Sequence, residues 1–244
     1  MDRSVYDRME EIDGTHWWFV ARRRIVSKLL ARQLAGRTGL RILEVGCGTG
    51  SNLAMLGQFG SVDAIEPDDR ARAVAVRRTG VAAQGGYLPD GVSLDDGAYD
   101  VIVLLDVLEH IPADVAALAA LRPKLARGGK LLLTVPAMPW LWSAHDLAHH
   151  HHRRYTRRKL EAVLAAAGFA LRHRSYFNSL LFPLIAAARA AGKISGRQGG
   201  DDAMPGPRMN RLLERIFSAE RLWIGRVSPP FGVSLAAVAV PSAG

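Results

Sequence analysis

The sequence predicts an α/β fold: a doubly wound, mostly parallel sheet of seven strands, with an N-terminal helical cap and a helical insertion before the last strand. Two observations support this prediction. From residue 40 onward, short apolar runs alternate with stretches of helical periodicity. The runs at 40–45, 100–105 and 129–135 are nearly continuous in Leu, Ile and Val, which is typical of parallel strands buried on both faces. Strands that alternate with helices build one such sheet through right-handed crossovers.

The remaining elements follow from the same periodicities. Residues 6–34 carry an apolar stripe at three- to four-residue spacing, which predicts one N-terminal helix. A later helix begins at Thr156, a good N-cap residue, and ends before Gly168. We expect further strands at 61–66, 81–84, 169–176 and 234–240, and further helices at 52–59, 69–78, 113–126, 178–193 and 209–226. The predicted organisation is a cap at 1–38, an α/β core at 39–177, a helical insertion or lid at 178–228 and the last strand of the core at 229–244.

The composition is that of a globular chain with a substantial core. Of the 244 residues, 49% are hydrophobic, which excludes disorder across the whole chain. The single cysteine, Cys47, excludes a disulfide framework and fits a reducing compartment. Neither a secretory signal nor an apolar stretch long enough to span a bilayer is expected. We therefore predict a cytoplasmic protein, with peripheral contact at the inner membrane surface as an open alternative.

The net charge of +9 belongs to one end of the chain. Residues 1–146 carry 17 Lys/Arg against 18 Asp/Glu, whereas residues 147–244 carry 15 against 5. A basic region raises nucleic acid or an anionic membrane as a partner. Nucleic acid is the less favoured of the two, because no recognised binding motif accompanies the arginines.

The segment LEVGCGTG closes the first strand with a glycine-rich turn before a helix. Gly46, Gly48 and Gly50 permit positive φ and let the backbone approach a ligand, and the helix N-terminus favours negative charge. A dinucleotide-binding fingerprint would need another glycine where this chain has Ser51. Glu66 ends the second strand twenty residues after Gly46, where a carboxylate can accept hydrogen bonds from ribose hydroxyls.

Together with YDVIVLLDVLEHI (99–111), this turn resembles the class I S-adenosylmethionine-dependent methyltransferases, similar to those acting on small molecules and quinone precursors. The resemblance covers about 39–136 and implies a Rossmann-like methyltransferase fold with S-adenosyl-L-methionine as cofactor. It implies that the glycine turn lines the methionine part of the cofactor, that Glu44 orients the amino group and that Glu66 holds the ribose. The cofactor-binding residues that it predicts in the core are Glu44, Gly46, Cys47, Gly48, Gly50, Glu66, Pro67, Gln84, Gly85, Gly86 and Asp106.

Asp106, Glu109 and His110 follow the fourth strand at the carboxyl end of the predicted sheet, where ligands bind in such folds. One interpretation is structural: Asp106 caps a helix and Glu109 completes a capping box. Another is chemical: the three side chains share one helix face, and His110 acts as general base on a substrate hydroxyl. A divalent metal is the third, because the resemblance associates similar segments with one. We take His110 and Glu109 as catalytic candidates and assign no metal ligand.

The N-terminal HWWF segment (16–19) resembles the aromatic cap that covers the cofactor in several family members. Trp18 is predicted to contact the cofactor, and Arg22 on the same stripe to pair with its carboxylate. The alternative is a docking face whose arginines are solvated.

The segment after the fifth strand, 140–155, leads to the acceptor side of the predicted site. Its predicted substrate-binding residues are His145, His152, Arg153 and Tyr155. Four consecutive histidines in this segment suggest metal binding. Neighbouring loop residues cannot all point at one ion, however, so we expect these histidines to face solvent or the acceptor.

The C-terminal region bears on the class of acceptor and on contact with a membrane. The apolar run 180–188 is too short to span a bilayer but could enter its interface, and arginines flank the helix predicted after it. A cap over the acceptor is the most economical interpretation, while a dimer face and membrane contact stay open. The sequence thus predicts S-adenosylmethionine-dependent methyl transfer to a small-molecule or lipid-like acceptor, at oxygen. The alternatives are an RNA methyltransferase that uses the basic region and a cofactor-binding module without catalysis.

Overall fold

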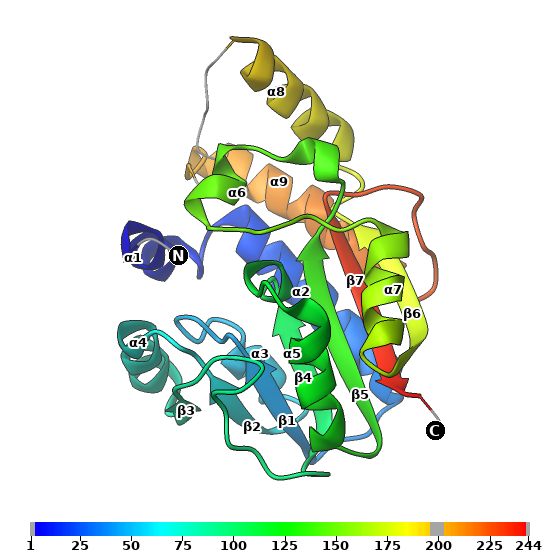
Figure 1. Cartoon of the computed structure of the whole chain (residues 1–244). Coiled ribbons are helices and arrows are strands. Elements are labelled where there is room, and N and C mark those ends of the chain that lie inside the picture. Colours follow the sequence, from blue (N-terminus) through cyan, green and yellow to red (C-terminus); the bar gives the residue numbers. More distant parts are fainter. Residues whose placement is uncertain (1–2, 196–202, 243–244) are drawn as a thin grey trace.

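The computed structural model describes residues 3–195 and 203–242, and it confirms the predicted fold class (Figure 1). Within these residues seven strands form one sheet in the order β3-β2-β1-β4-β5-β7-β6. β1 to β5 are parallel, and β7 runs antiparallel to both β5 and β6. The strands are β1 (Leu40–Val45), β2 (Gly60–Ile65), β3 (Ala83–Gln84), β4 (Tyr99–Leu105), β5 (Leu125–Pro136), β6 (Phe169–Phe177) and β7 (Ser234–Pro241). The edge of the sheet at which β1 to β5 end is called the carboxyl edge below.

Two helical layers cover the sheet. Along β4, Val101 and Val103 pack into one apolar cluster while Ile102 and Leu104 pack into another, because successive side chains of a strand point to opposite faces. The first cluster lies under α2 (Trp17–Leu34), α3 (Leu53–Leu56) and α9 (Pro207–Ala219), and the second lies under α5 (Asp114–Leu121) and α7 (Arg157–Ala166). The strands are therefore buried on both faces, as their continuous apolar runs predict.

The single N-terminal helix predicted at 6–34 is wrong: the structure has two helices, α1 (Arg3–Ile12) and α2. The chain turns between them at Asp13, whose side chain is fully buried, and His16 begins α2 by accepting a hydrogen bond from the Trp18 amide at 3.3 Å. α1 consequently lies beside α4 (Asp69–Thr79) instead of extending α2 (Figure 1).

Two other predicted helices are shorter than expected. The prediction at 52–59 contains the single turn of α3, and the prediction at 113–126 contains α5 and a 3-10 turn, η2 (Arg122–Lys124). Pro123 ends that helix because proline has no backbone N–H to donate, and the chain enters β5 at Leu125. The helix predicted from Thr156 is confirmed, since the Thr156 hydroxyl accepts a hydrogen bond from the Lys159 amide at 3.2 Å.

The insertion before β7 divides into two parts. α8 (Phe182–Ser195) projects from the carboxyl edge, whereas α9 packs along α2 (Figure 1). Trp17 of α2 contacts Phe217 of α9 edge to face at 5.9 Å, so α9 belongs to a layer of the core and is not simply a cover. A 3-10 turn, η4 (Glu220–Leu222), follows α9, and residues 196–202 of the predicted insertion lie outside the described residues. In the described part of the chain, every helix is too short or too polar to cross a membrane.

Candidate functional site

In the glycine turn after β1, two of the three glycines make contacts that a Cβ atom would block. Gly46, Gly48 and Gly50 have φ values of 72°, 54° and 81°. A Cβ on Gly46 would lie 2.6 Å from Cγ2 of Val107, and one on Gly50 would lie 3.0 Å from Ala75. A Cβ on Gly48 would meet nothing within 4 Å. Two glycines therefore let the turn pack against Val107, which follows β4, and against α4, while the third faces open space.

Glu66 holds this turn from the end of β2. Its side chain is buried, and its two carboxylate oxygens accept hydrogen bonds from the backbone amides of Gly48 (2.8 Å) and Asp68 (3.1 Å). Each carboxylate oxygen has more than one lone pair, so these bonds leave capacity for hydroxyl donors. The predicted residues of the neighbouring turn lie at the same edge: Pro67 is half-buried, and Gln84 and Gly85 are exposed. The Arg72 guanidinium covers Gly85 and donates to the Glu66 carbonyl at 2.7 Å.

Glu44, near the end of β1, lies in a buried polar pocket behind the turn. Its Oε1 accepts a hydrogen bond from Asn52 Nδ2 at 2.8 Å, and its side chain has no exposed surface. Burial raises the pKa of Glu44 to about 7, although the Asn52 hydrogen bond opposes the shift. Glu44 Oε2, Asn52 Oδ1 and Arg22 Nε are buried without a hydrogen-bond partner among the described residues. The pocket therefore offers two acceptors and one cationic donor to a ligand.

The capping box predicted at Asp106 and Glu109 is wrong. The chain after β4 forms only a 3-10 turn, η1 (Leu108–His110), which has no side-chain cap. Asp106 stands at φ 56°, and its carboxylate pairs with the Arg22 guanidinium (Nη2–Oδ2, 2.6 Å). Arg22 is 5% exposed and lies 5.1 Å from the Trp18 ring centroid, so the alternative of a solvated arginine at this position is also wrong.

Glu109 and His110 form the centre of a buried cluster with a third residue, His151. One ligand-type atom from each of the three side chains lies within 4.8 Å of the other two. Burial and the neighbouring Asp106 raise the pKa of Glu109 well above its ordinary value. Burial also lowers the pKa of His110 to about 3, so its imidazole is neutral at pH 7. The sequence pairs Glu109 with His110 by proximity, but His151 joins them only because the chain folds back.

The four histidines at 149–152 differ in their exposure, whereas the sequence led us to expect that they would behave alike. His150 and His152 are exposed, whereas the His151 side chain is only 7% exposed and its Nδ1 lies 2.9 Å from Oδ1 of Asp146. Asp146, at the start of α6 (Ala144–Ala148), also accepts from Arg154 Nε at 2.8 Å. Although burial opposes it, these hydrogen bonds hold the pKa of Asp146 below its ordinary value. His151 therefore does not face solvent, and contact of these histidines with an acceptor stays a prediction.

The predicted substrate-binding residues of this segment separate into two groups. His145 packs against His149, with the two ring centroids 4.1 Å apart. His152 is exposed. Tyr155 is fully buried, and its hydroxyl donates to Asp114 at 2.9 Å, so the structure contradicts its predicted contact with an acceptor. Arg153 pairs with the same Asp114 carboxylate at 2.6 Å. This pair joins the segment to α5, which sequence spacing gave no means of anticipating.

Sequence reasoning also missed Asp13, which fastens the N-terminal cap. The Asp13 carboxylate accepts hydrogen bonds from both Nη atoms of Arg78 (2.7 and 2.8 Å) and from the Thr49 hydroxyl at 2.9 Å. Thr49 belongs to the glycine turn and Arg78 to α4. The cap is thus attached to the turn that the sequence identified as a ligand-binding loop.

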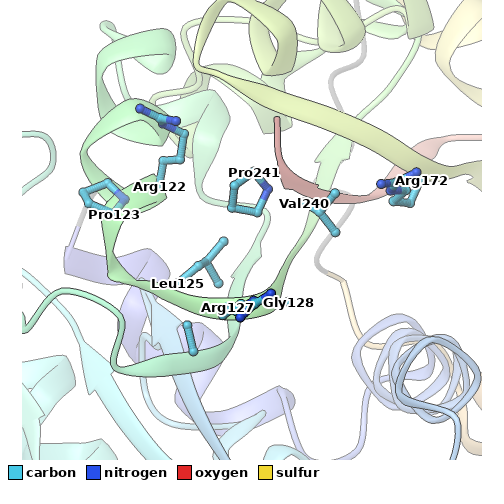
Figure 2. A pocket seen from close by; sticks show the side chains of 9 residues that line it. Arg122, Pro123, Leu125, Arg127, Gly128, Arg172, Val240 and Pro241 are labelled. Atoms are coloured by element: carbon cyan, nitrogen blue, oxygen red, sulfur yellow. The ribbon is translucent and has the colours of Figure 1, made fainter. Parts of the chain in front are cut away.

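A separate hollow lies at the other end of the sheet. Figure 2 shows its lining, which comes from η2, the amino end of β5, Arg172 of β6 and the carboxyl end of the antiparallel β7. Arg122, Arg127 and Arg172 surround an apolar floor that includes Leu125 and Val240. Since the glycine turn follows the carboxyl end of β1, this hollow is remote from the residues described above.

Comparison with known proteins agrees with this geometry. A family model described as a methyltransferase domain matches residues 18–174. No curated protein matches the sequence of this chain.

Several solved structures share the fold. One is the complex between the Trm112 methyltransferase activator of Haloferax volcanii and a methyltransferase (TM-score 0.66, 17% identity, 99% of this chain and 96% of that chain). Another, from Galdieria sulphuraria, is described as a sarcosine dimethylglycine methyltransferase (TM-score 0.59, 14% identity, 89% and 85%). The cyclase SpnF is similar as well (TM-score 0.59, 20% identity, 91% and 82%). At these identities the structures establish the fold alone.

The family model spans well over half of the chain and includes β1 to β5, the glycine turn and η1. The chain therefore belongs to the methyltransferase-domain family and is an S-adenosyl-L-methionine-dependent methyltransferase.

Proposed function

We propose that this chain transfers the methyl group of S-adenosyl-L-methionine to an oxygen atom of a small-molecule or lipid-like acceptor. The observation that carries the proposal is the contact between the glycine turn and Val107, which lies just before the cluster of Glu109 and His110. Gly46 packs directly on Val107, two residues before Glu109 and three before His110. A methyl donor held by the turn is then presented to a carboxylate and an imidazole that can hold an acceptor hydroxyl.

The partnerless buried atoms support the placement of the methionine end of the cofactor. Glu44 Oε2 and Asn52 Oδ1 suit an ammonium group, and Arg22 Nε suits a carboxylate. A free amino-acid end presents both charges together, so these residues fit the cofactor. We assign them to that end, with Gly46, Cys47, Gly48 and Gly50 as the backbone wall and with Trp18 and Asp106 beside Arg22.

The nucleoside end is assigned to the ends of β2 and β3. Glu66 accepts hydrogen bonds from ribose hydroxyls while it keeps its bonds to the two backbone amides. Adenine lies against Pro67 and the turn Gln84, Gly85 and Gly86, where the exposed Gln84 amide oxygen can accept from the adenine amino group.

Methyl transfer asks the protein mainly for alignment. The sulfonium supplies an already activated methyl group, so the residues of this chain align the acceptor, exclude water and provide a way to lose a proton. Glu109 and His110 are assigned to the acceptor side, with His145 and His152 at its margin. α8 borders the same edge of the sheet (Figure 1).

An aromatic group at the carboxyl edge supports the lipid-like class of acceptor. The Phe182 ring lies 5.8 Å from that of Trp140 and 5.0 Å from that of Phe231. Trp140 is 55% exposed, and Leu180 and Leu184, two residues before and after Phe182, are 49% and 62% exposed. Large apolar side chains gathered at the surface favour contact with lipid or another apolar partner.

The test is an acceptor screen with methyl-labelled cofactor. Soluble metabolites, a lipid extract and RNA are offered separately to the full chain. We expect label in the lipid or soluble fraction, in a product that resists the conditions that cleave methyl esters, because the proposed product is an ether. Label confined to RNA contradicts the proposal. His110→Ala is expected to abolish the labelling while cofactor affinity, measured by calorimetry, stays within about threefold of the wild-type value.

A further inference from the structure

The hollow at the amino end of β5 is bordered by cations that lack a partner. Arg122, Arg127 and Arg172, called the rim arginines below, are all exposed. In the described part of the chain none of the three makes an ion pair or a side-chain hydrogen bond, whereas the nearby Lys124 pairs with Asp96 at 2.6 Å. We propose that this hollow binds a small organic anion, a carboxylate or phosphate group carried on a compact apolar body.

Two breaks in strand register bring rim arginines to the hollow. Between two consecutive pairs with β4, the strand β5 has four residues (126–129) opposite one, and this bulge carries Arg127. On the other side of β7, β6 has one extra residue between Leu171 and His173, and that residue is Arg172. A bulge changes the direction of the side chain that it carries, and bulges are frequent next to binding sites. Two separate bulges thus place an arginine at the same hollow.

Glycines fix the bulge of β5 and the position of the third rim arginine. Gly128 has φ 77°, and a Cβ on Gly129 would lie 2.8 Å from the Ala126 carbonyl oxygen, so the bulge requires both glycines. A Cβ on Gly168 would lie 3.0 Å from Cδ of Arg122, so the Arg122 side chain lies across the backbone just after α7. Because the backbone positions these cations before a ligand arrives, binding orders few groups and its entropic cost is small.

The floor and the size of the hollow select the class of ligand. Leu125, Val240 and Pro241 lie among the rim arginines (Figure 2), so an apolar body would cover surface that now faces water. A guanidinium holds a carboxylate or phosphate through two parallel hydrogen bonds. The hollow has a volume of about 570 Å³, within the range of about 300–1,000 Å³ that small-molecule sites have. Its nine lining residues are fewer than the roughly 20–30 that a protein partner covers.

The ligand is tested with three probes on the full chain: phenyl phosphate, inorganic phosphate and phenol. Backbone amide NMR shifts measure the affinity and locate the site. We expect phenyl phosphate to saturate one site, with shifts centred on residues 122–128, 172 and 240–241. It should bind at least about tenfold more tightly than the other two probes, because each of them lacks either the apolar body or the anionic group. Saturating S-adenosyl-L-methionine should leave this affinity unchanged, since the hollow is remote from the glycine turn.

Substitution of the rim arginines identifies the recognising groups. Arg127→Gln and Arg172→Gln each remove one exposed cation and keep a long polar side chain, so the fold is retained. Each should weaken phenyl phosphate binding by about three- to tenfold. Arg158→Gln is the matched control, because Arg158 is an exposed arginine of α7 that does not line the hollow. It should leave the affinity unchanged.

Four results would overturn the proposal. One is the absence of phenyl phosphate binding. Another is equal binding of inorganic phosphate, or an equal loss for Arg158→Gln, because either means attraction to positive charge alone. The third is displacement of phenyl phosphate by the cofactor, which would place the probe in the cofactor site. In the fourth, Arg127→Gln and Arg172→Gln release the chain from phosphatidylglycerol vesicles but leave phenyl phosphate binding unchanged, so that the rim arginines contact a lipid surface instead.

Discussion

At the scale of single residues, the glycine turn depends on the absence of one side chain. Gly46 combines a left-handed backbone (φ 72°) with a Cβ position 2.6 Å from Val107, so a larger residue meets both strain and overlap. Left-handed backbone costs a residue with a Cβ about 1–2 kcal/mol, and overpacking adds about 1–3 kcal/mol.

Gly46→Val is therefore expected to weaken cofactor binding more than about tenfold, since the turn must move away from Val107. Calorimetry with S-adenosyl-L-methionine measures this. Gly36→Ala is the control: Gly36 has φ 84° but open space around its Cβ position, far from the site, so it should lose only about 1–2 kcal/mol of stability and no affinity. Equal affinities for the two variants would contradict the assignment of the turn.

The buried side chain of Glu44 lowers the stability of the chain when it is charged, and in that form it is proposed to bind the cofactor. Its pKa is about 7 in the folded chain against an ordinary value of 4.5, because burial disfavours the charged carboxylate. Its contribution to stability is therefore fully present below about pH 4.5 and is lost as the pH rises to about 7, over which range the unfolded chain releases the proton first.

Glu44→Gln removes this loss while its amide oxygen can still accept from Asn52. We expect the variant to be more stable than the wild type by about 1–3 kcal/mol at pH 8 and to approach equality near pH 5, as measured by denaturant unfolding. The same variant should bind the cofactor more weakly at pH 8, because the ammonium loses a charged partner. The exposed Glu11→Gln should change neither quantity; a Glu44→Gln chain that is less stable at pH 8 refutes the pKa argument.

At the scale of elements, one buried carboxylate fastens the junction between α1 and α2, whereas α2 is held by its apolar side chains in the core. Asp13 connects the break between α1 and α2 to both α4 and the glycine turn. On α1 itself, Asp7 pairs with Arg70 at 2.9 Å, but both side chains are about half exposed, which leaves such a pair little net value.

Asp13→Asn should therefore cost about 2 kcal/mol of stability, less than a fully buried pair because Arg78 is 35% exposed. It should also weaken cofactor binding and make the α1–α2 junction more sensitive to limited proteolysis. Asp7→Asn, the matched change on the same cap, should cost no more than about 0.5 kcal/mol. If the two variants behave alike, Asp13 does not fasten the cap.

The elements also mark where sequence patterns succeed and where they fail. β1, β4 and the helix from Thr156 follow directly from apolar runs and capping chemistry, and they form where expected. The break at Asp13 was missed because the apolar stripe continues across it, and only long-range partners show that the carboxylate leaves the helix. The capping box predicted at Asp106 is wrong for the same reason, because Arg22, more than eighty residues away, forms an ion pair with that carboxylate.

At the scale of the whole molecule, the structure shows where part of the excess positive charge of residues 147–244 lies. The insertion (178–228) carries 8 of the 15 Lys/Arg residues of 147–244, and it places α8, with the exposed Leu184, at the carboxyl edge (Figure 1). Arg208, Arg211 and Arg215 line one surface of α9. Apolar and cationic side chains on the same insertion favour an anionic lipid surface.

We predict that the chain sediments with anionic phospholipid vesicles and is released as salt is raised. Leu184→Asp should reduce the bound fraction severalfold. Leu222→Asp is the control, because Leu222 is as exposed (64% against 62%) but belongs to η4, where its carbonyl accepts from Arg32 of α2. Binding that is insensitive to Leu184→Asp, or equally strong to uncharged vesicles, excludes this surface as the contact.

The sequence by itself determined the fold class, the glycine turn and the residues that follow each strand, because these depend on local periodicity and on backbone conformations that only glycine adopts readily. Only the tertiary structure decided which distant groups meet. It pairs Arg22 with Asp106 and joins Tyr155 to Asp114 by a hydrogen bond. It also brings His151 close to Glu109. The physical reason is that burial and pairing of charges depend on neighbours in space, and these neighbours are separated by tens of residues in the chain.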